Sequence, residues 1–135
     1  MLPIYRFEQI GEDLELVPLA GRRALDAAGR KVALLEWRAL PHDARQLIVD
    51  AGGHEVVDVE AVRSALGSSE GAPISTTPEP SRDALPDALA GKGLSLAWWS
   101  RLRALDRFAL HSLARRGRDD GLKALRAELG EPRST

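Results

Sequence analysis

The chain contains no cysteine among its 135 residues. This absence excludes disulfide bonds, cysteine-ligated zinc, iron–sulfur clusters and thiol catalysis. A chain of this length can bury a hydrophobic core without a covalent staple. The composition therefore fits a reducing compartment.

Long apolar runs are missing as well. No stretch approaches the roughly 20 consecutive apolar residues that a membrane-spanning helix needs. The first residues, Met1 to Glu8, show no basic segment followed by an apolar one, so they do not resemble a signal peptide. We therefore expect a cytoplasmic protein that does not associate with membranes.

Aromatic residues are scarce, at 4% of the chain, whereas 44% of the residues are hydrophobic, many of them Ala and Leu. Ala and Leu favour helices, and β-branched and aromatic residues favour strands. The length suits one domain rather than two independent ones. We predict an all-α, compact multi-helix domain (1–135) built from two helical halves around one core.

Helix start and stop signals organise the first half, residues 1–67. Proline in a first turn and glycine after a last turn bound a helix, and an N-cap carboxylate begins one. These signals predict helices from Pro18 to Gly29, from Pro41 to Gly52-Gly53 and from Asp58 to Gly67. The first has a face of small residues (Val17, Ala20, Gly21, Ala24, Ala28) that would let another helix approach closely, and the second has a stripe of Ala44, Leu47, Ile48 and Ala51. Periodicity does not assign the apolar run 31–37; we predict it to be extended.

Residues 68–82 are rich in Ser, Thr, Pro, Gly and Glu, which predicts a flexible linker. The second half, 83–130, is a close series of helices, and 131–135 would be a disordered tail. In the second half we predict a turn from Pro86 to Gly91 and a short helix capped by Ser95. A longer helix carries Leu105, Phe108, Ala109 and Leu113 and ends at Gly117. The last helix is capped by Asp119 or Asp120 and has a stripe of Leu122, Leu125 and Leu129.

One pattern occurs twice, 62 positions apart. Trp37, Leu40 and Arg45 are matched in spacing by Trp99, Leu102 and Arg107, and each copy leads into an apolar stripe. Such an echo indicates either an ancient duplication or two helices packed pseudo-symmetrically.

The same residues carry a resemblance to a known family. The segment Val17-Pro18-Leu19, Arg22, Leu25-Asp26, Gly29, Lys31-Val32, Leu34 and Trp37, and the later segment Trp99, Leu102, Leu105 and Arg107-Phe108-Ala109-Leu110 with Leu113, resemble two blocks of the nitrate-reductase-associated protein family. Phe7-Glu8 is similar to its aromatic–acidic opening. The chain departs from the pattern near Ala28, where a Cys is expected, at Asp106, where a Gln is expected, and in the longer insert 68–82.

The resemblance implies a small accessory protein that supports the activity or maturation of an assimilatory nitrate reductase or another molybdenum-cofactor oxidoreductase. That enzyme would be its protein partner. The resemblance implies no catalysis and no cofactor of its own. From the resemblance and the repeated pattern together, we assign a structural motif to Pro18, Asp26, Gly29, Trp37, Arg45, Trp99, Arg107 and Phe108.

Catalytic and metal-binding patterns are weak. No pair among His42, His54 and His111 has metal-ligand spacing, and we interpret His42 and His111 as ordinary surface residues. Most Ser and Thr residues lie in the predicted linker or tail, and Gly91-Lys92-Gly93 lacks the spacing of a phosphate-binding loop. We expect no enzyme activity.

The segment from Arg101 to Arg126 carries eight bases and three acids, although the net charge of the whole chain is −1. Three interpretations stay open: a solvated basic face, a surface for an acidic partner, and nucleic-acid binding by a small regulatory domain. Nucleic acid is the least favoured of the three.

Trp98 and Trp99 are neighbours, so on a helix they point about 100° apart and only one can face the core. An exposed Trp beside arginines is a good interface anchor. The predicted partner-binding residues are Trp98, Arg101, Arg103, Arg115, Arg116 and Arg118. For Arg45 and Arg107 we favour buried pairing with Asp26 or Glu8 over a binding role.

Overall fold

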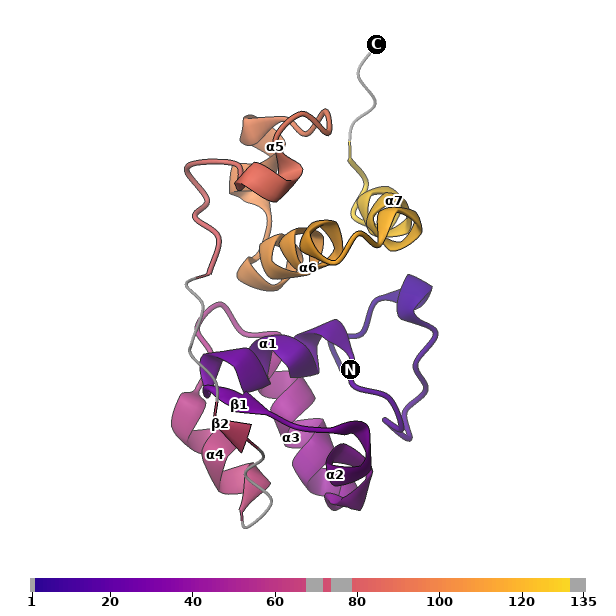
Figure 1. Cartoon of the computed structure of the whole chain (residues 1–135), viewed down its shortest axis with the longest axis vertical. Coiled ribbons are helices and arrows are strands. Elements are labelled where there is room, and N and C mark those ends of the chain that lie inside the picture. Colours follow the sequence, from indigo (N-terminus) through magenta and orange to yellow (C-terminus); the bar gives the residue numbers. More distant parts are fainter. Residues whose placement is uncertain (1, 68–71, 74–78, 132–135) are drawn as a thin grey trace. The chain divides into compact units, whose positions relative to one another are not determined.

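The computed structural model describes residues 2–67, 72–73 and 79–131 and is mostly helical, as the sequence predicted (Figure 1). The chain divides into two compact units. The first comprises residues 1–4 and 8–78, and the second comprises 5–7 and 79–135. The short segment Tyr5–Phe7, mostly within the 3₁₀ turn η1 (Arg6–Glu8), therefore belongs with the second unit although its neighbours belong to the first.

The first unit contains four α-helices and one strand pair in the part of the chain that the structure describes. The helices are α1 (Leu19–Ala27), α2 (Leu34–Ala39), α3 (His42–Gly52) and α4 (Val59–Leu66). The two-residue strands β1 (Arg30–Lys31) and β2 (Ala72–Pro73) pair antiparallel, with Arg30 opposite Pro73 and Lys31 opposite Ala72.

The second unit contains the 3₁₀ turn η2 (Asp87–Leu89) and the helices α5 (Leu96–Arg101), α6 (Ala104–Arg115) and α7 (Asp119–Glu128). In Figure 1 α5 to α7 run from salmon to yellow. The apolar sides of α6 and α7 are buried, with Leu105, Ala109, Leu110, Leu113, Leu122 and Leu125 in the core.

The first predicted helix is confirmed, but it begins one residue after Pro18, which was predicted as its first position. Pro18 is the N-cap residue of α1, and Gly29 has a φ of 71°, which glycine adopts without strain. The carboxylate of Glu8 accepts a hydrogen bond of 2.7 Å from the amide of Leu19, so a residue 11 positions away satisfies the first turn. Of the small-residue face, Ala20, Gly21, Ala24 and Ala28 are buried and Val17 is half-buried.

The prediction of an extended segment over 31–37 is wrong for most of its length. Only Arg30–Lys31 form a strand, and α2 begins at Leu34. The carboxylate of Glu36 reaches back to the amide of Ala33 at 3.0 Å and stabilises the first turn. A helix of six residues is too short for its periodicity to be visible in the sequence.

The predicted stripe of α3 is rotated about its axis. Ile48 and Val49 are fully buried, whereas Leu47 is 44% exposed. The rotation follows from Gly52, because a Cβ atom at this position would lie 2.5 Å from the carbonyl carbon of Ala20 in α1. At Gly52 the backbones of α1 and α3 therefore approach so closely that no side chain fits between them, and this contact fixes which face of α3 is buried.

Helix capping follows the sequence signals in two of three cases. Asp58 accepts from the amide of Ala61 at 3.1 Å to begin α4, and Ser95 accepts from the amide of Trp98 to begin α5. The prediction that Asp119 or Asp120 caps α7 is wrong, because Arg118 occupies the N-cap position. Both aspartates lie in the first turn, where their charge still favours the positive end of the helix dipole.

The predicted linker and tail lie mostly outside the described residues, which omit 68–71, 74–78 and 132–135. Within the predicted linker, Ala72–Pro73 pairs with β1. Glu131, assigned to the tail from the sequence, forms an ion pair of 2.6 Å with Arg126. Among the described residues no helix is both long and apolar enough to cross a membrane.

Candidate partner-binding site

The repeated tryptophans do the same structural job in the two units. Trp37 and Trp99 are both fully buried. The indole N–H of Trp37 donates to the carbonyl of Leu14, and that of Trp99 donates to the carbonyl of Ser81, each at 2.7 Å. Burying an indole is favourable when its N–H finds an acceptor. The two Trp residues therefore fasten loops rather than face a partner.

The repeated arginines also contact main-chain carbonyls. Arg45 donates to the carbonyl of Leu14 at 3.0 Å, and Arg107 donates to that of Leu102. The predicted pairing of these arginines with Asp26 or Glu8 stays a prediction. Arg107 is only 6% exposed, which indicates a packing role.

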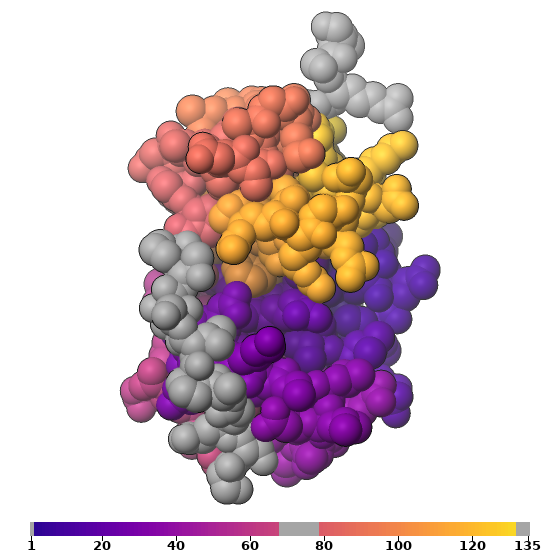
Figure 2. Space-filling model, in the orientation of Figure 1, coloured from indigo at the N-terminus to yellow at the C-terminus, as the bar shows by residue number. Residues whose placement is uncertain are grey.

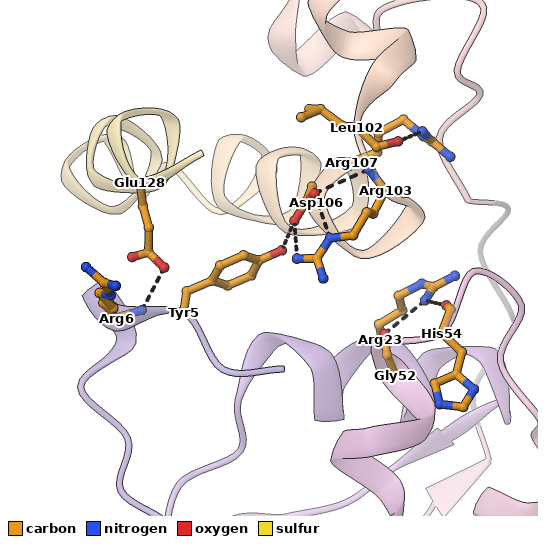
Figure 3. Close-up of polar contacts among 10 residues, drawn as sticks. All are labelled: Tyr5, Arg6, Arg23, Gly52, His54, Leu102, Arg103, Asp106, Arg107 and Glu128. Carbon is orange, nitrogen blue, oxygen red and sulfur yellow. Dashed lines mark hydrogen bonds and ion pairs between the residues drawn. The ribbon is translucent and has the colours of Figure 1, made fainter. Parts of the chain in front are cut away.

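A buried polar network lies at the start of α6 (Figure 3). The hydroxyl of Tyr5 donates to Asp106 at 2.5 Å, and the guanidinium of Arg103 pairs with the same carboxylate at 2.9 Å. The hydrogen bond between Arg103 and Asp106 is the main reason that the pKa of Arg103 lies above its usual value. Asp106 thus holds two side chains by charge-assisted hydrogen bonds.

The segment Tyr5–Phe7 is held to the second unit by a second carboxylate. Glu128, in the last turn of α7, accepts from the amides of Arg6 and Phe7 at 2.8 and 3.0 Å. Figure 3 shows the bond from Arg6. The rings of Tyr5 and Phe7 stack with centroids 6.0 Å apart. The segment is therefore fixed through both its main chain and its aromatic side chains.

Arg23 is a buried residue that the sequence reasoning missed. It is 1% exposed, and its guanidinium donates to the carbonyls of Gly52, the last residue of α3, and of His54 and Glu55 just beyond it. Figure 3 shows the bonds to Gly52 and His54. A cation here satisfies carbonyls that lack a partner within the helix and opposes the negative end of its dipole. The burial of Arg23 could have been predicted from its position in the sequence, because it lies beside the small-residue face of α1 that packs against another helix.

The other motif residues have packing roles. Asp26 is half-buried in the last turn of α1, and Phe108 is half-buried in α6. No group of three His, Asp or Glu residues within the described ranges is placed to hold a metal ion.

The predicted partner-binding residues fall into two groups. Trp98 is half-buried and Arg101 is exposed, both in α5, and Arg103 begins α6. Arg115, Arg116 and Arg118 are exposed at the other end of α6. A helix of 12 residues is about 18 Å long, so the structure does not bring the six residues together in one cluster. The sequence reasoning also missed Leu96, which is 47% exposed on the same short helix as Trp98.

A shallow groove of about 510 Å³ lies along α7, and Figure 2 shows residues of this helix, in gold, spread over the surface that faces the viewer. It is lined by Lys92, Asp119, Leu122, Lys123, Arg126, Ala127 and Glu131. Within it Arg126 binds Glu131 and donates to the carbonyl of Lys92 at 2.8 Å. The groove therefore presents mixed charge rather than one ligand chemistry.

The fold and its surface define a small all-α protein whose repeated Trp-Leu-Arg pattern holds the structure together and whose second unit exposes Arg101, Arg103, Arg115, Arg116 and Arg118. The model of the conserved nitrate reductase-associated protein family matches residues 4–127, and the chain belongs to this family. The comparisons with curated proteins and with solved structures find no match.

Proposed function

We propose that this protein is a non-catalytic, cytoplasmic accessory partner of an assimilatory nitrate reductase, and that it supports the activity or maturation of this molybdenum-cofactor enzyme. The observation that carries the proposal is the family match over residues 4–127.

The placement of the motif residues supports a binding role rather than a catalytic one. Trp37, Trp99 and Arg107 are buried and contact main-chain carbonyls. The buried carboxylate of Asp106 is held by Tyr5 and Arg103. These groups are engaged in packing, so the surface is left to interact with a partner.

The proposal is tested in the native host by deleting the gene and restoring it with a tagged copy. We expect the deletion to lower nitrate reductase activity in extracts, the tagged copy to restore it, and the reductase to co-purify with the tag during growth on nitrate. The purified protein alone, given nitrate and a chemical electron donor, is expected to form no nitrite.

Full reductase activity in the deletion strain, with no reductase recovered on the tag, would exclude the proposal. Nitrite formation by the isolated protein would instead show that it is an enzyme. A reductase that is inactive in the deletion strain but regains activity when the purified protein is added would distinguish support of activity from support of maturation.

A further inference from the structure

The loop 11–16 of the first unit is fastened through its main chain. Its carbonyls accept from four side chains of α2 and α3 at 2.6–3.1 Å: Leu14 from Trp37 and Arg45, Glu15 from Arg38, and Glu12 from His42. The side chain of Leu14 is fully buried. The loop therefore lies against α2 and the first turns of α3 and is held in one conformation.

The surface that the loop shares with α2 and α3 is acidic. Five exposed carboxylates belong to it: Glu12, Asp13, Glu15, Glu36 and Asp43. None of the five forms an ion pair with any residue that the structure describes. Arg38, the exposed base of α2, donates to the main-chain carbonyl of Glu15. The surface therefore carries a net negative charge.

Exposed leucines lie on the same surface. At 100° per residue, Leu34, Leu35 and Arg38 lie within a sector of about 100° around the axis of α2, and Leu35 points about 160° away from the buried Trp37. Leu34 is 41% and Leu35 is 78% exposed. Leu16, in the loop that binds Arg38, is 48% exposed. Exposed apolar side chains are ordinary when they are scattered singly, but these three lie together beside the carboxylates.

The fold does not require the large side chains on this side of α2. The helix α5 has the same length of six residues and also buries one Trp completely. It has Ala97 and Ser100 at the positions that Leu35 and Arg38 hold in α2. The same local structure therefore forms with small residues there, and packing does not account for Leu35.

We propose that the acidic α2 face, formed by Glu12, Glu15, Leu16, Leu34 and Leu35, docks a segment of the nitrate reductase that carries basic and apolar side chains together. This inference rests on the proposed function and assigns the reductase contact to the first unit. The carboxylates meet the bases of the segment, and the leucines cover its apolar side chains. The negative charge repels nucleic acid and anionic lipid surfaces, which favours a protein as the occupant.

The test measures equilibrium binding of the full-length protein to the purified reductase at low and at moderate salt. Leu35→Ser removes the most exposed leucine of the face, and the double variant Glu12→Lys, Glu15→Lys reverses its charge. Each is expected to weaken binding by at least about tenfold, as the loss of an interface anchor does. Added salt is expected to weaken binding of the wild type and to have less effect on the double variant.

The chain offers a matched control for each change. Val56 is 83% exposed and follows the end of α3, whose opposite end binds the loop. Asp50 and Glu60 are exposed acids of the same unit, so the double variant Asp50→Lys, Glu60→Lys changes the net charge equally. Val56→Ser and this double variant are expected to bind within about twofold of the wild type, because few residues carry most of the binding energy of an interface. Circular dichroism checks that every variant keeps its helical content.

The possible outcomes separate the two proposals. If the wild type does not bind the reductase, the proposed function fails and the docking face fails with it. If the wild type binds and the variants of the acidic α2 face bind equally well, or if the controls lose as much affinity, the docking face is refuted and the proposed function stands. Self-association of the wild type that Leu35→Ser removes, with binding of the reductase unchanged, would show that a second copy occupies the face instead.

Discussion

Replacing Gly52 by alanine tests the packing of α1 against α3. An added Cβ would lie 2.5 Å from the carbonyl carbon of Ala20 and closer still to its oxygen. Both obstacles are main-chain atoms, so rotation of a side chain cannot relieve the overlap. The two helices must separate, and the carbonyl of Gly52 must move from the guanidinium of Arg23, which binds it at 2.9 Å.

The magnitude follows from three opposing effects. Overpacking a close interior contact costs about 1–3 kcal/mol, and weakening a hydrogen bond to a charged donor costs about 1.5–3 kcal/mol. In the opposite direction, alanine has a higher helix propensity than glycine, which stabilises the helix by about 1 kcal/mol. We therefore expect Gly52→Ala to lower the free energy of unfolding by about 3 kcal/mol, which corresponds to a fall of about 10 °C in Tm for a chain of this size.

Thermal unfolding followed by circular dichroism at 222 nm measures this change. Gly21→Ala, on the other helix of the same pair, is the matched control because its added Cβ would meet a side-chain atom, Cγ1 of Val17, at 3.1 Å. Its overlap and its gain in helix propensity should nearly cancel. A Tm for Gly52→Ala within about 3 °C of the wild type would refute the close approach of α1 and α3.

Three further changes test individual contacts. Trp37→Phe removes the indole donor to the Leu14 carbonyl, to which Arg45 still donates, and we expect it to lower the urea midpoint in proportion to a loss of about 0.5–1.5 kcal/mol. Tyr5→Phe removes the hydroxyl donor to the buried Asp106, and unfolding in guanidinium chloride should show that the free energy of unfolding falls by about 1.5–3 kcal/mol. Burial, and then the charge of Arg115, lowers the pKa of His111. The unfolded chain therefore binds this proton more readily, so stability is complete above about pH 6.5 and declines below it. His111→Gln should flatten the profile of Tm against pH below about pH 6.5. An unchanged slope in that range would contradict the role of His111 in the decline.

Local signals in the sequence predicted most helix boundaries correctly. Pro18, Asp58, Ser95 and Gly29 act through their own backbone or through residues three positions away, so a short window of sequence contains the information. The helical class followed from composition for the same reason. The early end of β1 and the start of α2 were missed because a six-residue helix has less than two turns.

Contacts between distant residues explain the remaining errors. The exposure of Leu47 depends on which side of α3 meets α1, and Gly52 sets that side through a clash with Ala20. The burial of Arg23 depends on carbonyls about 30 residues away. In the candidate site, the exposure of Leu96 and the separation of Arg101 from Arg116 depend on the lengths and packing of α5 and α6, which side-chain patterns in the sequence do not determine.

The two copies of the repeated pattern share their donors but not their acceptors. In the first unit, Trp37 and Arg45 both bind the carbonyl of Leu14, whose φ of 54° is unusual for a bulky residue. Two strong donors on one carbonyl, together with a fully buried side chain, hold this strained backbone in place. In the second unit, Trp99 and Arg107 bind two different carbonyls. Because any loop can supply a carbonyl, the pattern fixes the helices while the loops diverge in sequence. Residues outside the pattern, such as Trp98 and Arg101, are therefore where a binding function can differ between the two halves.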